Sequence, residues 1–138
     1  DANADKIGVG EVMANDGEAK QLDTTIALVA TDADGKVVYS KIDVAQINEK
    51  TTDTKSERKE DYGMKGVSPI GKEWYEQAQF FEQFCKGKTA DEIAGIETEK
   101  RDEEHTTVPK TGSDLAAGCT MDIGAFLEAV AEAFTNAQ

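Results

Sequence analysis

The chain has little of what several common kinds of functional site require. Its 138 residues include two cysteines, too few for a disulfide scaffold. Cys85 and Cys119 also lack the Cys-x-x-Cys spacing of a structural zinc site. The one histidine, His105, sits in an acidic run typical of a solvated turn, so a triad hydrolase would lack a placed base. Apolar runs are only a few residues long, whereas a bilayer-spanning helix needs roughly 20, so we expect no membrane-spanning segment.

Positive charge is scarce as well. Lys and Arg number 15 against 28 Asp and Glu, which gives a formal net charge of -13. Such a surface repels nucleic-acid phosphates and anionic lipid headgroups, so we do not expect a nucleic-acid partner. The length predicts about one compact domain. The chain begins at Asp1 with no charged-then-apolar signal segment, which is typical of a mature or trimmed chain.

The clearest strand pattern predicts a β-hairpin. Residues 24–31 are rich in β-branched side chains and residues 36–44 alternate, with Asp34–Gly35 between them as a tight-turn signal. Residues 1–23 are acidic and contain several glycines. We expect them to form a loop-rich lead-in with at most a short strand around residues 7–12.

Three patterns predict helices. Apolar residues recur at helical spacing between Lys72 and Gly87. Thr89–Glu92 has the form of a capping box and predicts a short helix to about Ala94. The apolar spacing from Ile123 to Phe134 predicts a terminal helix, with Asp122 as its N-cap.

The remaining segments indicate exposed structure. Residues 48–61 are wholly polar, which favours an exposed edge strand, a loop, or both, and residues 97–113 favour a surface loop. Strands in a meander followed by helices, without βαβ alternation, predict an α+β fold. We expect one domain over residues 24–138, an antiparallel sheet with helices packed on one face or end.

The candidate for chemistry is the string Asp114-Leu115-Ala116-Ala117-Gly118-Cys119-Thr120, directly before the terminal helix. Gly118 would let the backbone approach a ligand closely, and the helix N-terminus offers amides and a positive dipole end. The Thr120 hydroxyl can bond to a phosphate there. The residues alone leave open the alternative of an ordinary helix start capped by Thr120 or Asp122.

This string resembles the flavinylation motif of the FMN-binding domain family, found in flavinylated electron-transport subunits and in Firmicutes extracellular FMN-binding lipoproteins. The family motif runs Asp, two variable residues, Ser or Thr, Gly, Ala, Thr. Its last Thr carries FMN through a phosphoester, installed by a flavin transferase that uses FAD. The resemblance makes Thr120 the acceptor and matches Asp114 and Gly118. Ala117 and Cys119 depart from the motif, and Ala117 removes a hydroxyl that could bond to the phosphate.

The resemblance extends over roughly residues 20–135. Outside the motif it rests on Asp34–Val38, Tyr62–Lys65, Ile70–Gln77 and Gly87–Thr89. Tyr62 and Met64 are the expected neighbours of an exposed flavin ring. Lys65 and Lys72 could pair with phosphate or ring oxygens, and the alternative that they only offset local negative charge stays open. Trp74 shares the helix stripe and favours the core.

The resemblance implies an extracytoplasmic electron-transfer flavoprotein domain, secreted or on a cell-surface lipoprotein. It is an electron carrier more than a catalyst with its own substrate, with FMN as cofactor. The implied partners are a flavin transferase and redox partner proteins or quinone-linked electron donors. Two alternatives stay open: a module that binds flavin or another small anion without covalent attachment, and a structural surface domain that has lost the cofactor.

The two cysteines are predicted to be buried free thiols. Cys85 lies on the apolar stripe with Phe81, and cysteine is among the most buried residue types. An exported domain could instead form a bridge, if the two Cα atoms lie within about 7 Å.

Overall fold

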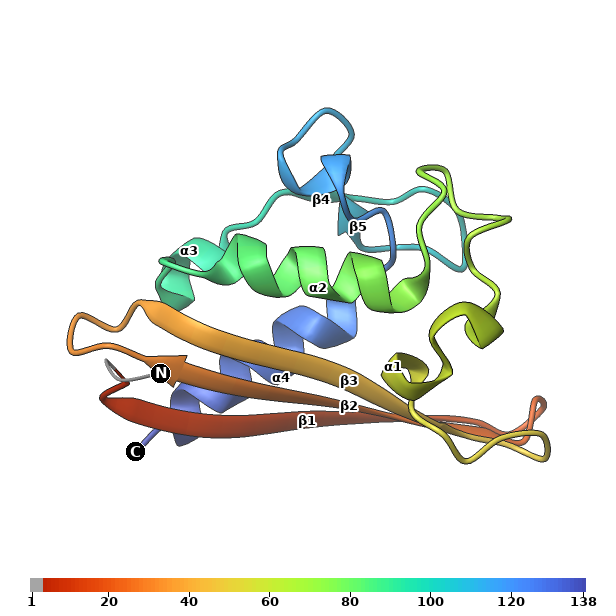
Figure 1. Ribbon diagram of the computed structural model, residues 1–138, viewed down its shortest axis with the longest axis horizontal. Helices are drawn as coiled ribbons and strands as arrows, with labels where there is room; N and C mark the ends of the chain where they lie inside the picture. The colour runs from red at the N-terminus through yellow and green to blue at the C-terminus, as the bar shows by residue number, and fades with distance from the viewer. Residues whose placement is uncertain (1–3) are drawn as a thin grey trace.

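The computed structural model describes residues 4–138 (Figure 1). A three-stranded antiparallel sheet in the order β1-β2-β3 forms one layer. Its strands are β1 (Lys6–Asp16), β2 (Gln21–Thr31) and β3 (Val37–Ile47). The other elements are α1 (Lys55–Arg58), the 3-10 turn η1 (Lys59–Tyr62), α2 (Trp74–Cys85), α3 (Ala90–Ala94), β4 (Thr98–Glu99), β5 (Val108–Pro109), the 3-10 turn η2 (Leu115–Ala117) and α4 (Gly124–Asn136). The predicted α+β class with an antiparallel sheet is confirmed.

The predicted hairpin is strands β2 and β3. Gly35 has a φ of +76°, a conformation that glycine adopts without steric cost. The Asp32 carboxylate closes the turn by accepting bonds from the amides of Asp34 at 2.9 Å and Lys36 at 3.0 Å. Turn chemistry in the sequence therefore sets the register of these strands.

The expected loop-rich lead-in is wrong for residues 6–16, which form β1. This strand pairs along its full length with β2, so it belongs to the same fold as the rest of the sheet. Its alternation is hidden in the sequence because glycines occupy the buried face. Gly8 and Gly10 are buried under α4, whereas Ile7 and Val9 point outward and are about half exposed.

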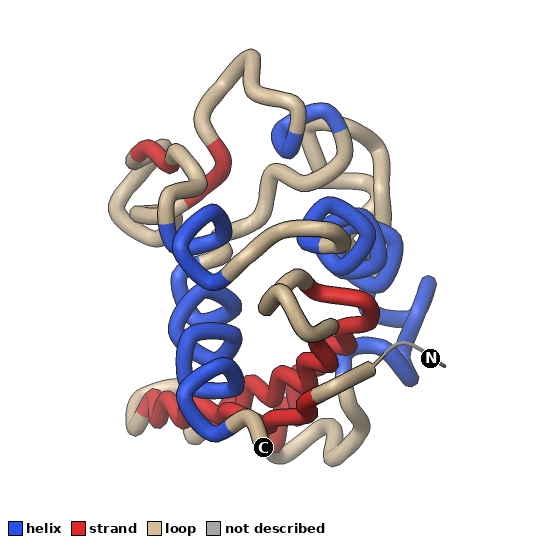
Figure 2. The backbone as a smooth tube through the Cα atoms, turned by 90° about the vertical axis from the view of Figure 1, so that its left-hand side faces the viewer, coloured by secondary structure: helices blue, strands red, loops and turns tan. Residues whose placement is uncertain are grey.

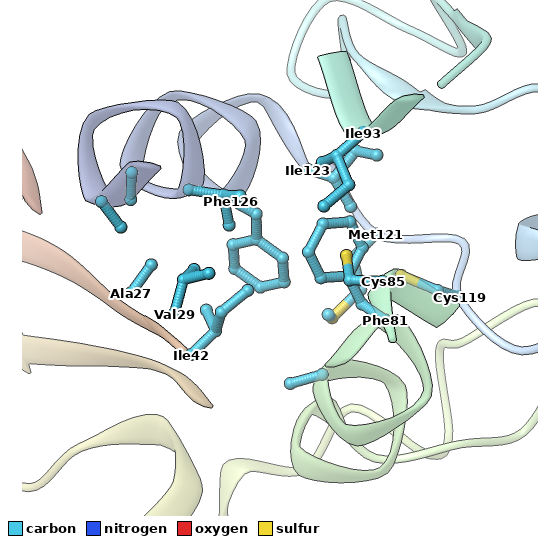
Figure 3. Packing of buried hydrophobic residues seen from close by; sticks show 14 of the residues in the cluster. Ala27, Val29, Ile42, Phe81, Cys85, Ile93, Cys119, Met121, Ile123 and Phe126 are labelled. Atoms are coloured by element: carbon cyan, nitrogen blue, oxygen red, sulfur yellow. The ribbon is translucent and has the colours of Figure 1, made fainter. Parts of the chain in front are cut away.

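Helices α2 and α4 lie on the same face of the sheet (Figures 1 and 2). Helix α4 packs on β1 and β2, and α2 packs on β3. Phe126 joins the two helices, because its ring centroid lies 5.9 Å from that of Trp74 and 5.4 Å from that of Phe81. Figure 3 shows Phe126 among the core side chains of the sheet and of α2. The apolar side chains of α2 and α4 therefore form a single hydrophobic core with those of the sheet.

Helices α2 and α3 confirm their sequence patterns, and Thr89 caps α3 in the predicted capping box. Three other expectations need correction. The polar run 48–61 contains a short helix, α1, whose own capping box at Thr54 and Glu57 starts it. The loop 97–113 carries the small β4–β5 hairpin. Helix α4 begins one residue later than predicted, so its N-cap is Ile123 and not Asp122.

The sheet face opposite the helices carries exposed apolar side chains, including Ile7, Val9 and Met13 of β1. None of the helices in residues 4–138 combines the length and the apolar character that crossing a membrane requires.

Candidate functional site

A pocket of about 710 Å³ lies where the sheet, the start of α2 and the start of α4 meet. Small-molecule sites in proteins typically enclose about 300–1,000 Å³. The floor includes Val12 and Thr25 of the sheet, and Trp74 and Phe126 belong to the helices. The segment 64–69 and the loop 101–105 supply the remaining sides. Chain segments far apart in sequence therefore converge on one cavity.

Three of the residues that the sequence singles out line this pocket: Thr120, Tyr62 and Met64. Thr120 lies in the short connection between η2 and α4 and is half-buried. Tyr62 ends η1, and Met64 follows it after Gly63. The fold thus brings the motif threonine and the two expected ring neighbours to the same cavity.

The other five do not line it. Asp114, Ala117 and Lys65 are exposed. Cys119 is 0% exposed and belongs to the hydrophobic core. Gly118 is closely approached, but by a side chain of the protein, as a Cβ atom there would lie 2.2 Å from the ring of Phe80. The space beside Gly118 is therefore filled by the ring of Phe80 and not left open for a ligand.

Gln77 also lines the pocket, and its side chain holds Thr120 there. Its Oε1 accepts a hydrogen bond from the Thr120 amide at 2.9 Å and one from the Thr120 hydroxyl at 3.5 Å. Its Nε2 donates to Ser68 Oγ at 3.2 Å and to the Lys72 carbonyl at 3.1 Å. Gln77 thus connects Thr120 to the glycine-rich segment that borders the pocket.

Arg101 holds Thr120 from its carbonyl side, at the peptide group that follows the one bound by Gln77. Its Nη1 donates to the carbonyl oxygen of Thr120 at 2.8 Å. The loop that carries Arg101 is folded around Asp102, whose Oδ1 lies 2.7 Å from His105 Nδ1. That hydrogen bond is the main cause of the lowered pKa of Asp102. Thr120 is therefore anchored at both its amide and its carbonyl.

Asp122 lines the pocket, and its carboxylate is already engaged by the backbone. Its Oδ1 accepts from the Gly124 amide at 2.8 Å, and its Oδ2 accepts from the Thr106 amide at 3.1 Å. Backbone N–H groups offset part of the negative charge of a carboxylate. Asp122 thus ties the loop after His105 to the beginning of α4.

Cations stand among the aromatic residues of the pocket. Lys55 Nζ lies 5.2 Å from the ring centroid of Tyr62 and 5.7 Å from that of Trp74. Both distances lie within the range of a cation–π contact. The guanidinium of Arg101 supplies a second positive charge at the pocket. Three acids, Asp23, Glu104 and Asp122, also line the pocket and offset these positive charges.

The pocket lining offers the kinds of group that would contact the ring and the phosphate of a flavin mononucleotide. Thr120 offers a hydroxyl at the pocket wall, and Lys55 and Arg101 are partners for phosphate or ring oxygens. The apolar lining suits a flat aromatic ring; it includes Val12, Val44, Met64, Met121 and Phe126. Within the described part of the chain, no group of three or more His, Cys, Asp or Glu residues is arranged to hold a metal ion.

Sequence reasoning missed Gln77, Lys55 and Arg101. Gln77 had a signal, because it is a polar residue on the buried stripe of α2 beside Trp74 and Ala78. Lys55 stands in the first turn of a helix that the capping box at Thr54 could have indicated. Nothing local marks Arg101, whose contact with Thr120 depends on the folding of the loop.

Comparison with known proteins gives one partial likeness. A protein named chlorophenol reductase, from Desulfitobacterium hafniense, is 35% identical to this chain over 51% of the chain and 28% of its own length. The chain therefore matches less than a third of that protein. No family model matches the chain, and no solved structure matches it.

Proposed function

We propose that this domain is an electron carrier that holds FMN in the pocket, linked covalently through the Thr120 hydroxyl. The observation that carries the proposal is the position of Thr120. The motif threonine lies on the wall of a pocket of about 710 Å³ together with Tyr62 and Met64. An acceptor residue on the wall of a partly apolar cavity is what a tethered cofactor requires.

The attachment is a phosphoester exchange with FAD as co-reactant. Thr120 Oγ1 forms a bond to the phosphorus of the FMN half, and the pyrophosphate P–O bond breaks. AMP leaves with the electron pair of that bond, and the hydroxyl proton passes to a base of the flavin transferase. Lys55 and Arg101 would hold negatively charged oxygens, and the apolar wall would contact the ring. When bound, the flavin supplies the redox chemistry, and the protein supplies its position.

The cellular setting is part of the same proposal. The family resemblance supports an extracytoplasmic location, on a secreted protein or cell-surface lipoprotein, with redox proteins or quinone-linked donors as partners. The partial likeness to a protein named a reductase is compatible with a redox role. The reduction of chlorophenol belongs to that protein's name and is not proposed for this chain.

The test is co-expression of the chain with a flavin transferase, followed by intact-mass measurement after denaturation. We expect an added mass of one FMN less one water. Thr120→Ala abolishes the addition, whereas Thr120→Ser retains it because the hydroxyl remains. Thr111→Ala is the matched control, since its hydroxyl bonds to Glu99 and not to the pocket.

Modification of the Thr120→Ala protein would overturn the assignment of the acceptor. A chain that is yellow after purification but loses its flavin on denaturation would favour non-covalent binding, which the pocket cations Lys55 and Arg101 could provide. A colourless, unmodified chain in the presence of active transferase and FAD would favour a structural domain without cofactor.

A further inference from the structure

We propose that Gln77 is the positioning residue of the acceptor, fixing the Thr120 hydroxyl at the pocket wall so that a flavin transferase can modify it. This inference rests on the proposed function. It names a residue outside the motif, on a different element, that decides how fast the motif threonine reacts.

The first observation is the burial of an amide among apolar side chains. Gln77 is 1% exposed and lies on the stripe of α2 that faces the core. Burying such a group is unfavourable unless its hydrogen bonds are made. An apolar residue would pack at this position of α2 without that requirement, so the polar group is there for its partners.

The second observation is that both the donors and the acceptor of the Gln77 side-chain amide have hydrogen-bond partners. A glutamine side chain has two N–H donors and one carbonyl oxygen with two lone pairs. The donors serve Ser68 Oγ and the Lys72 carbonyl, with Met64 Sδ at 3.5 Å as a weaker partner. The oxygen accepts a hydrogen bond from the Thr120 amide at 2.9 Å, and the Thr120 hydroxyl is a weaker partner at 3.5 Å. One side chain therefore sets the position of the acceptor relative to the segment that borders the pocket.

These hydrogen bonds affect the reactivity of Thr120 because they orient its hydroxyl group. The 2.9 Å bond to the Thr120 amide fixes the backbone from which the hydroxyl projects, and the weaker 3.5 Å contact turns the hydroxyl hydrogen toward Gln77 Oε1, so the hydroxyl oxygen keeps lone pairs for a phosphorus atom. A neutral amide does not take up the proton, so Gln77 acts through position and not as a base. Reactions between oriented groups lose less entropy on reaching the transition state.

The donor side of the amide separates glutamine from glutamate. Gln77→Glu keeps an acceptor for the Thr120 amide, but it loses the donors to Ser68 and Lys72 and adds a negative charge beside an incoming phosphate. Gln77→Met keeps the approximate shape and removes the strong hydrogen bonds; methionine adapts well to core sites. Both variants preserve the volume of the side chain.

The experiment measures flavin transfer from FAD to the purified domain by intact mass, at several concentrations of the domain. Gln77→Met and Gln77→Glu are compared with Gln79→Met and Gln79→Glu, since Gln79 is exposed on the same helix. We expect kcat to fall at least tenfold in both Gln77 variants, with KM for the domain within twofold of wild type. The Gln79 variants keep both constants. Cooperative thermal unfolding verifies that each variant is folded, and faster hydrogen exchange at the Thr120 amide verifies that the bond is lost in Gln77→Met.

Transfer to a folded Gln77→Met domain at the wild-type rate overturns the inference and leaves the proposed function intact. A raised KM with unchanged kcat also overturns it, because that result assigns Gln77 to docking of the transferase. A wild-type chain that is never modified overturns the proposed function, and the inference with it. If Gln77→Met fails to unfold cooperatively, transfer to a folded Gln77→Glu domain at the wild-type rate overturns the inference in its place.

Discussion

A Cβ atom at Gly10 would lie 2.0 Å from the carbonyl oxygen of Ala129, so β1 and α4 touch backbone to backbone. Gly8 has the same relationship to Ala133, at 1.9 Å. Glycines on the strand thus face alanines on the helix, and α4 lies as close to the sheet as main-chain atoms permit. This contact therefore holds α4, which begins at Gly124 shortly after Thr120 and Asp122, close against β1.

The Gly10–Ala129 contact predicts that Gly10→Ala is destabilising. The added methyl group meets a carbonyl oxygen and cannot be relieved by a side-chain rotation, so helix and strand must separate. Overpacking of this kind costs roughly 1–3 kcal/mol. Urea unfolding of Gly10→Ala checks the value, with Gly17→Ala as the control, because nothing lies within 4 Å of a Cβ atom at Gly17. Equal stability of the two variants would show that the contact is not tight in solution.

Much of the fold is predictable because its elements carry their own signals. The Asp-Gly turn predicts the β2–β3 hairpin, and apolar spacing and a capping box predict α2, α3 and α4. Strand β1 is not predictable in this way. Glycine on its buried face is favourable only because α4 lies against it, and that is a property of the packed structure.

The residues of the site also fall into two groups, those that the sequence predicts and those that only the packed structure reveals. The motif and its resemblance predict Thr120, Tyr62 and Met64, which the fold brings to one pocket. Gln77 and Arg101, which anchor Thr120, reach it from other elements. Long-range contacts of this kind leave no periodic trace in the sequence. A polar residue on an apolar stripe, as at Gln77, is the one local mark that such a contact exists.

The raised pKa of the buried Glu82 side chain predicts that the stability of the protein depends on pH. Burial raises the pKa of this carboxyl above its ordinary value of 4.5, while its Oε2 accepts from the Ile42 amide at 2.7 Å. Because the folded state binds the proton more tightly than the unfolded state, Glu82 contributes less to stability as the pH rises from 4.5 through the raised pKa. The Glu82→Gln variant retains an acceptor for Ile42 and has no charge to bury.

We therefore expect Glu82→Gln to gain stability relative to wild type as the pH increases from 4 to 8. Thermal or urea unfolding of both proteins across this range measures the difference. Glu128→Gln, at an exposed position of α4, is the matched control. A constant difference between Glu82→Gln and wild type at all pH values would mean that Glu82 titrates alike in the folded and unfolded chains.

Asp122 predicts a loss of stability that is independent of any cofactor. Its carboxylate accepts bonds from the amides of Gly124 and Thr106, so Asp122→Ala leaves both donors without this partner. Hydrogen bonds to charged groups contribute about 1.5–3 kcal/mol, and we expect a loss within that range. Asp61→Ala, at an exposed position of η1, should change stability by much less. Unfolding curves that overlap for the Asp122→Ala and Asp61→Ala proteins would contradict the role of Asp122 in joining the loop to α4.

The burial of Cys85 and Cys119 predicts that their thiols react with a maleimide only when the protein unfolds. Both are free and at most 1% exposed, and burial raises the pKa of Cys85 to about 12 and that of Cys119 to about 11. The thiolate is the nucleophile, so neither the charge state nor the access favours reaction at neutral pH. We expect a maleimide to leave the native chain unmodified and to add to both cysteines in denaturant without reductant. If the denatured chain reacts only after a reductant is added, the two cysteines form a bridge in the purified protein, and the prediction of free thiols is wrong.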